Sequence, residues 1–405
     1  IRDFYMDIFL KNAEIVLFDR NIHGNLEITK NFISKIDGEN NSNNSSLSID
    51  CSNLKIFPGF IDSHVHGGYG YDFEQNSESS YDEFAKSVVQ EGVTKFVLAS
   101  VTSSSEKISK CLTTFAKYYK NQRSFNNKKA ICLGVHLEGP FISLEKKGAH
   151  KEDLIMNPNI ELMTKWINDS SNTIRIVTFD IENDINSSFL KFLNSKRIIG
   201  SVGHTNSTAA TFAKKAGDVG CYRVTHLFNA MSGLSHQKPG VAAAALNDKR
   251  VLCELICDGF HVDKNLIKIA YTCKKGKGIT LITDAMSAKG KPDGFYKLGD
   301  LDVEKKNGKC VIKNTNTLAG SVATFSQCFK NFHDWIQPND QELALISSYN
   351  SAKQLNLDKF IGQIKQGLLA DLTLVNQNYE VVMTICEGNI SYIKKEYEYI
   401  LNNKE

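Results

Sequence analysis

Histidines and acids that could bind a metal ion recur along this sequence at the ends of apolar runs. Each one alone would be an ordinary buried or helix-capping group, but burying several such charges without a cation would be costly. Imidazole and carboxylate groups together suit Zn²⁺ or Fe²⁺, and a catalytic site keeps one coordination position open for water. The sequence therefore predicts a catalytic metal site. The side chains concerned are His64, His66, Glu138, His204, His226, His261 and Asp284.

The spacing of the first two histidines adds a geometric reason. His64 and His66 are two residues apart in the apolar run 57–66, and alternate side chains of a β-strand point to the same face. Both rings can therefore bind one ion if this run is a strand.

The elements that must position these groups are eight apolar runs, most of them followed by a stretch with helical spacing. Near-continuous apolar runs are typical of parallel strands buried on both faces, and their alternation with helices favours a (β/α)8 TIM-type barrel of the α/β class. In such a barrel the functional groups lie at the carboxyl ends of the strands. A doubly wound sheet is the alternative, but it needs fewer strands, and no glycine-rich dinucleotide motif follows the first run. The runs are 57–66, 94–100, 131–139, 174–180, 197–205, 223–229, 252–262 and 278–287.

Both ends of the chain alternate apolar and polar residues as half-buried strands do, over 5–55 and 369–393. We expect a small β-sandwich domain built from 1–56 and 365–405, with the barrel at 57–364 between them. Residues 288–318 are interpreted as an insertion that forms a hairpin over the barrel mouth, and the asparagine-rich run 39–46 as a loop.

Composition excludes several other classes of protein. The 405 residues contain 48 Lys plus Arg and 45 Asp plus Glu, a net charge of +3, so we expect no nucleic-acid partner. No apolar stretch reaches the roughly 18 residues of a membrane span. The ten cysteines are scattered without a C-x-x-C pair, which predicts no disulfide framework and a cytoplasmic location. Because the sequence begins at Ile1 rather than methionine, we expect that residues before it are missing.

Ordered motifs along nearly the whole chain resemble those of one family. They are PGFIDSHVHG at 58–67, HLEGPFI at 136–142, GAH at 148–150, SVGHT at 201–205, THLFNAM at 225–231, DGFHVD at 258–263, ITDAMSA at 282–288 and TLAGS at 317–321. In this order they resemble the N-acetylglucosamine-6-phosphate deacetylases of the amidohydrolase superfamily. The resemblance implies a metal-dependent hydrolysis of the N-acetyl group of an amino-sugar phosphate by a homodimeric enzyme.

The resemblance also implies roles for single residues. Glu138, His204 and His226 match the family's metal ligands, and Asp284 matches its catalytic acid–base. Family members with one histidine in the first-strand motif hold one ion, whereas those with two can hold two. Because this chain keeps His64 and His66, one ion or two per subunit remain open, with Glu138 as the bridging ligand of a pair. The implied substrate-binding residues are Ala149, His150, Asn229, Ala230, Gln237, His261, Leu318, Ala319 and Gly320.

One departure from the family pattern concerns the phosphate. A basic residue usually precedes the acid–Pro–Gly segment after THLFNAM, but Gln237 stands there in SHQKPG, between His236 and Lys238. Phosphate recognition must then use one of the flanking residues, or weaken. For the transition state, we expect an oxyanion contact from His136 or His261.

Two other functions remain as alternatives. The first is another amidohydrolase activity, of the cyclic amidase or dipeptidase type. Many such enzymes carry a modified lysine at the end of the fourth strand, where this chain has TFD at 178–180. The second is an inactive barrel that acts as a scaffold, which the intact set of ionisable residues argues against.

Overall fold

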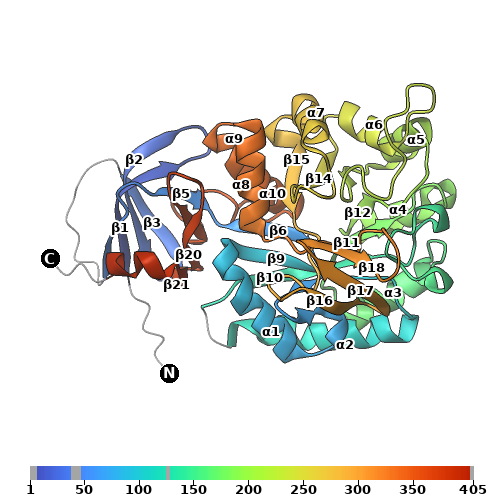
Figure 1. Cartoon of the computed structure of the whole chain (residues 1–405), viewed down its shortest axis with the longest axis horizontal. Coiled ribbons are helices and arrows are strands. Elements are labelled where there is room, and N and C mark those ends of the chain that lie inside the picture. Colours follow the sequence, from blue (N-terminus) through green and yellow to red (C-terminus); the bar gives the residue numbers. More distant parts are fainter. Residues whose placement is uncertain (1–6, 38–46, 125–127, 402–405) are drawn as a thin grey trace.

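Strands from both ends of the chain form one sheet beside a larger barrel (Figure 1) in the computed structural model, which describes residues 7–37, 47–124 and 128–401. The sheet order is β21-β20-β19-β5-β1-β2-β3, with β4 paired to β1. The two ends of the chain meet where β5 pairs antiparallel with β19. The strands are β1 (Ile8–Val16), β2 (Asn21–Thr29), β3 (Phe32–Asp37), β4 (Leu47–Asp50), β5 (Lys55–Pro58), β19 (Leu372–Val375), β20 (Val381–Cys386) and β21 (Asn389–Ile393).

The prediction of a small β-domain from both termini is confirmed. Its strands enclose an apolar core of their own, in which Ile15, Leu26, Ile56 and Leu374 are buried. The alternation of apolar and polar residues along each strand supplies this core, because every second side chain of a strand points inward. The strand β5 runs across the expected boundary between residues 56 and 57, so the domain boundaries stay predictions. The predicted loop at 39–46 and the chain start before residue 7 lie outside the described residues.

The barrel is confirmed, and each of the eight apolar runs supplies one of its strands. The order is β15-β14-β13-β12-β11-β10-β9-β6, with every pair parallel. The circle closes at the carboxyl ends of the first and last strands. There the backbone N–H of Asp284 donates to the carbonyl of His64 at 2.9 Å, and that of His66 to Ala285 at 2.8 Å. The strands are β6 (Phe60–Val65), β9 (Val93–Ser100), β10 (Ile131–Glu138), β11 (Ile174–Phe179), β12 (Ile199–Val202), β13 (Arg223–Val224), β14 (Leu252–Ile256) and β15 (Ile279–Ile282).

Helices surround the barrel (Figure 1), and most of them pack apolar side chains against it. In α2, Ile108, Leu112 and Phe115 are buried at spacings of four and three, and Ser104 caps the helix by accepting from the backbone N–H of Lys107. The helices are α1 (Glu78–Ser87), α2 (Ser105–Asn121), α3 (Ile160–Asp169), α4 (Ser188–Ser195), α5 (Ala209–Val219), α6 (Val241–Asn247), α7 (Lys264–Lys274), α8 (Phe325–Ile336), α9 (Asp340–Ala344) and α10 (Asn350–Gln354), with a π-helical turn (Leu345–Tyr349) between the last two.

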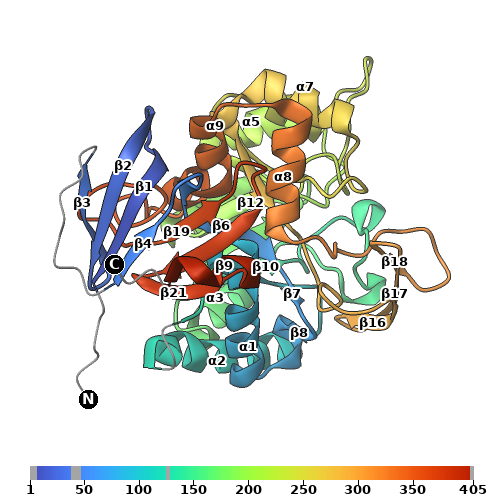
Figure 2. The same cartoon turned by 60° about the vertical axis from the view of Figure 1, so that its left-hand side comes forward.

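The predicted insertion after the eighth strand is a three-stranded antiparallel sheet rather than a hairpin (Figure 2). It consists of β16 (Gly294–Leu298), β17 (Leu301–Lys306) and β18 (Lys309–Ile312). Leu298, Val303 and Cys310 pack with Met286 and Ala319 into a small cluster. This cluster anchors the sheet beside the carboxyl ends of the barrel strands. Two shorter strands, β7 (Gly67–Gly68) and β8 (Tyr71–Asp72), pair after β6.

Two expected strand positions are wrong. The strand β13 ends at Val224, so His226 lies after it, and His261 lies beyond the end of β14 at Ile256. At His226 the backbone has a φ of 29°, which a strand cannot adopt. Both histidines therefore lie on loops above the barrel.

Candidate metal centre and active site

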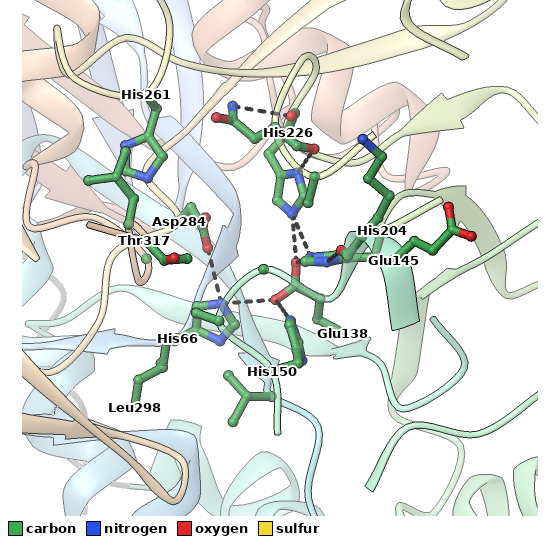
Figure 3. Close-up of a pocket in the computed structure, with 18 residues that line it drawn as sticks. His66, Glu138, Glu145, His150, His204, His226, His261, Asp284, Leu298 and Thr317 are labelled. Carbon is green, nitrogen blue, oxygen red and sulfur yellow. Dashed lines mark hydrogen bonds and ion pairs between the residues drawn. The ribbon is translucent and has the colours of Figure 1, made fainter. Parts of the chain in front are cut away.

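A cavity of about 300 Å³ opens at the carboxyl ends of the barrel strands (Figure 3). Most of the predicted chemical groups lie on its floor, and the inserted segment 288–318 contributes Leu298, Thr317 and Leu318 to its lining. The cavity is lined by His66, Val101, Glu138, Glu145, Lys146, Gly148, Ala149, His150, His204, His226, Asn229, Ala230, His261, Asp284, Leu298, Thr317, Leu318 and Gly320.

Glu138, the last residue of β10, is the centre of the first group of ligands. Its Oε1 lies 2.9 Å from His226 Nε2 and 3.3 Å from His204 Nε2. The Nδ1 atom of His204 donates to the carbonyl of Lys146 at 2.8 Å, and that of His226 to the carbonyl of Asn229 at 3.1 Å. These bonds place the proton on Nδ1 and leave the Nε2 lone pair of each neutral ring facing Glu138.

The second group lies beside the first and shares Glu138. His66 Nε2 is 3.0 Å from Asp284 Oδ1 and 3.3 Å from Glu138 Oε2. His64 Nε2 is 3.5 Å from Asp284 Oδ1 and 3.6 Å from Glu138 Oε1, and it has no hydrogen-bond partner among the described residues. All of these side chains are buried.

The donor set fits a divalent metal. The Nε2 atoms of His204 and His226 are 3.1 Å apart, and two lone pairs this close repel each other unless a cation lies between them. Two sets of side chains that share Glu138 come near enough to hold an ion, namely His64, His66, Glu138 and Asp284, and Glu138, His204 and His226. The geometry therefore accommodates one ion or a pair that shares Glu138.

The electrostatics of the cluster keep both of its carboxylates ionised. Burial would raise the pKa of Glu138, but the nearby His64 and the hydrogen bond from His150 lower it well below its usual range. Burial also opposes ionisation of Asp284, yet His64 and His66 lower its pKa. Burial lowers the pKa of His204 to about 4, which keeps that ring neutral. Two ionised carboxylates thus face the neutral ring of His204. Burial lowers the pKa of His66, but Asp284 and Glu138 raise it to about 9, so a metal ion must displace a proton there.

Three of these side chains depend on unusual backbone angles. His204, His226 and Asp284 have φ values of 47°, 29° and 50°. These values lie in the left-handed region, which is energetically unfavourable for any residue other than glycine. The carbonyl of Asp284 accepts from the N–H of Ser321 at 2.7 Å, and a Cβ at Gly320 would lie 3.0 Å from the same oxygen. Glycine at 320 therefore allows the close approach that holds Asp284 in place.

Glu254, which the sequence interpretation missed, lies directly below the metal ligands. Its Oε2 accepts from His64 Nδ1 at 2.9 Å and from the backbone N–H of His226 at 3.0 Å. Its Oε1 accepts from Arg223 Nε at 2.8 Å, and Arg223 and Glu254 are fully buried. An acid in the apolar run at 252–256 was the signal that could have revealed it. Although His64, His136 and Glu254 also come close together, the Arg223 guanidinium already supplies the cation there.

The two candidate oxyanion residues occupy different places. His261 lines the cavity, and its Nδ1 donates to Asp258 at 2.7 Å, which fixes the ring and leaves Nε2 for the cavity. His136 is fully buried against Thr178 at 2.7 Å and does not line the cavity. Of the two, only His261 is placed to meet a substrate.

The remaining predicted substrate residues are mostly, but not all, at the cavity. Ala149, His150, Asn229, Ala230, Leu318 and Gly320 line it. Ala319 is buried behind the wall.

The segment with the expected phosphate contact lies elsewhere. Gln237 is exposed and outside the lining, as are His236 and Lys238. Lys146, which the sequence interpretation did not single out, contributes the cavity's one lysine or arginine side chain among the described residues.

His150 has a different tautomer from the metal ligands. Its Nδ1 accepts from the backbone N–H of Thr102 at 3.2 Å, which places the ring proton on Nε2 in the neutral form. That Nε2 lies 3.5 Å from Glu138 Oε2. His150 is therefore a donor toward Glu138 or a bound substrate.

Comparison with known proteins agrees with this geometry. The family described as "Amidohydrolase family" matches residues 56–391. An N-acetylglucosamine-6-phosphate deacetylase of Bacillus subtilis (strain 168) is 36% identical over 345 residues, which cover 85% of this chain and 86% of the relative.

Solved structures extend the likeness to nearly the whole fold. The N-acetylglucosamine-6-phosphate deacetylase of Thermotoga maritima is 35% identical with a TM-score of 0.86, over 95% of this chain and all of that one. A point mutant of the Mycobacterium smegmatis deacetylase, in complex with N-acetyl-D-glucosamine-6-phosphate, is 27% identical with a TM-score of 0.86, over 95% of this chain and 99% of that one. The chain belongs to the amidohydrolase family and, within it, to the N-acetylglucosamine-6-phosphate deacetylases.

Proposed function

We propose that this protein hydrolyses the N-acetyl group of N-acetyl-D-glucosamine 6-phosphate to glucosamine 6-phosphate and acetate. The observation that carries the proposal is the meeting of Asp284 with the Glu138, His204 and His226 group on the floor of one cavity. An acid–base carboxylate beside a metal-binding set is what hydrolysis of an amide requires. Membership in a family of deacetylases supports the same reaction.

The metal that the proposal includes is Zn²⁺ or Fe²⁺, with one or two ions per subunit. Glu138, His204 and His226 would hold the first ion, and His64 and His66 with Glu138 the second. Imidazole nitrogens and carboxylate oxygens suit both metals. An ion bound here would lower the pKa of a water molecule and polarise the acetyl carbonyl.

Side chains of the protein then transfer the protons of the reaction. Asp284, which is ionised because its pKa is lowered, accepts a proton from the attacking water as the new C–O bond forms. It delivers this proton to the nitrogen as the C–N bond breaks, so that acetate and a free amine leave. His261, fixed by Asp258, is placed to contact the carbonyl oxygen. In its doubly protonated form, its Nε2–H would donate to this oxygen as negative charge develops on it.

Recognition of the 6-phosphate is assigned to Lys146 rather than to Gln237 or its neighbours. Lys146 lines the cavity, and its amine forms no hydrogen bond or ion pair with another described residue. The 236–238 segment is exposed in the single chain, so it could reach a phosphate only from another direction, such as across a dimer interface.

The wider setting of the enzyme is part of the proposal. We expect a cytoplasmic homodimer with domains at 57–364 and at 1–56 plus 365–405. All ten cysteines are free, and nine of them are buried, which suits a reducing compartment. Among the described residues, no helix is long and apolar enough to cross a membrane.

Replacing Asp284 with asparagine tests the reaction assignment. The variant Asp284→Asn is expected to lose about 10²–10⁴-fold in kcat, the usual contribution of an acid–base group, and to retain its metal. Acetate release and elemental analysis measure the two quantities, with the exposed Asp302→Asn as the matched control. A near-normal kcat for Asp284→Asn would show that the assigned role is wrong.

A further inference from the structure

A second cavity, of about 670 Å³, opens at the opposite end of the barrel from the active site. Tyr222 precedes β13, Leu252 begins β14, and Lys277 lies just before β15. The amino ends of parallel strands meet at one end of a barrel, away from the carboxyl ends that hold the metal ligands. Phe18 from the turn between β1 and β2 completes the wall, so the cavity lies between the β-domain and the barrel.

The lining of this cavity is strongly positive. Lys249, Arg250, Lys277 and Lys353 contribute to it, and none of its lining residues is acidic. Arg250 pairs with Asp248 at 2.7 Å. The three lysines are exposed, and their amines form no hydrogen bond or ion pair within the part of the chain that the structure describes. Three uncompensated cations around one hollow are unusual in a chain whose whole net charge is +3, and they attract an anion.

Aromatic side chains give the same cavity apolar surfaces. Phe18 and Tyr222 are 50% and 43% exposed, and Tyr349 meets Phe18 edge to face at 5.0 Å. Rings of this kind pack against the flat face of a sugar or a nucleobase. The volume lies within the range of roughly 300–1,000 Å³ that small-molecule sites occupy. The cations favour binding of a phosphate group, and the aromatic surfaces favour binding of a ring to which that phosphate is attached.

We propose that this cavity is a second ligand site, which binds a small phosphate ester carried on a ring, as in a sugar phosphate or a nucleotide. The proposal does not depend on the reaction at the other end of the barrel. The lining offers no anionic group for a cationic ligand, and its charge disfavours an uncharged apolar one.

Buried contacts join this cavity to the metal centre. Gln354, which lines the cavity, accepts a hydrogen bond from Arg223. Arg223 pairs with Glu254 at 2.6 Å, and Glu254 accepts from His64 at 2.9 Å. A ligand that displaces Gln354 therefore acts on the side chain that orients His64. We expect that occupancy of the cavity changes the affinity of the His64 and His66 pair for metal.

Calorimetric titration of the metal-loaded protein tests the proposal with three phosphorylated probes: glucose 6-phosphate, adenosine diphosphate and inorganic pyrophosphate. The matched variants are the triple charge reversal Lys249→Glu, Lys277→Glu, Lys353→Glu and a control reversal of three exposed helical lysines, Lys117→Glu, Lys214→Glu, Lys268→Glu.

The cavity reversal is expected to weaken binding of a ring phosphate by about tenfold or more, and the control by less than about twofold. Tighter binding of glucose 6-phosphate identifies a sugar phosphate as the ligand class, and tighter binding of adenosine diphosphate a nucleotide. Basal acetate release should be the same in both variants, which separates this site from the catalytic one. Equal affinities of the two variants for every probe, or pyrophosphate binding as tightly as both ring phosphates, would overturn the proposal. Unchanged metal affinity when a probe is bound would overturn the link through Gln354.

Discussion

Substitution of Glu254 is expected to weaken the metal centre although Glu254 is not itself a ligand. Burial opposes ionisation of this carboxyl, but Arg223 and His64 lower its pKa far below the usual range, so it is a buried anion. It holds the proton of His64 on Nδ1 and so directs Nε2 toward Glu138 and Asp284. In Glu254→Gln the amide has one acceptor side and one donor side. Arg223 lies on one side of this group, and His64 with the backbone N–H of His226 lies on the other, so the donors of one side must face the amide NH2.

Two magnitudes follow from these contacts. Removing one partner of a buried ion pair costs about 3–5 kcal/mol of stability, because the other charge stays buried and unpaired. Losing the carboxylate behind a metal-binding histidine weakens metal affinity by about 10- to 100-fold. Urea unfolding measures the first effect, and equilibrium dialysis with elemental analysis measures the second. The exposed Glu161→Gln serves as the control and should change neither.

A double variant separates orientation of His64 from simple loss of stability. In Arg223→Met with Glu254→Leu, both buried charges are removed, and replacement of a buried pair by apolar groups is often neutral for stability. His64 still lacks its acceptor, so metal affinity should remain low while the unfolding midpoint recovers. Metal affinity equal to that of the unaltered protein in a folded Glu254→Gln or double variant would refute the reasoning.

Two further predictions concern the substrate and pH. Lys146→Ala is expected to raise the KM for the 6-phosphorylated substrate by about tenfold, the contribution of a charged hydrogen bond, whereas Gln237→Ala should leave it unchanged in the same acetate-release assay. The opposite pattern would assign phosphate recognition to the 236–238 segment. Burial raises the pKa of Glu74 from 4.5 to about 7, although Lys107 opposes this shift. The folded state therefore favours the protonated form of Glu74 more strongly than the unfolded state does. The stability that this protonated form contributes is lost as pH rises through about 7. Glu74→Gln should therefore raise the free energy of unfolding at pH 8 by up to roughly 3 kcal/mol, and this advantage should disappear below the unfolded pKa of 4.5. An equal gain at pH 8 and at pH 4 would contradict this assignment.

The pattern of apolar runs was sufficient to predict the barrel and the β-domain of both termini. Buried parallel strands need continuous apolar residues, so each of the eight runs marked a strand. Residues just beyond a strand were harder to place. His226 and His261 follow β13 and β14 on loops, because the backbone turns sharply at positions that no local pattern marks.

Ligand types were predictable from the sequence, whereas the residues that orient them were not. His64 and Glu138 stand at strand ends where chemistry is expected, and their motifs resemble those of a known family. Glu254 and Arg223 lie within strands, and only the fold shows that they meet below His64. The phosphate contact stays a prediction for a similar reason, because the position of Gln237 in a motif says nothing about which side chains line the cavity of the single chain.

Acetate release from N-acetylglucosamine with and without the 6-phosphate tests the proposed activity most directly. The metal-loaded enzyme is expected to release one acetate for each glucosamine 6-phosphate formed. Its kcat/KM should be roughly ten- to hundredfold higher for the phosphorylated substrate, because a single charged contact contributes on that scale. Equal values for both sugars, or no acetate from either, would contradict the proposed function.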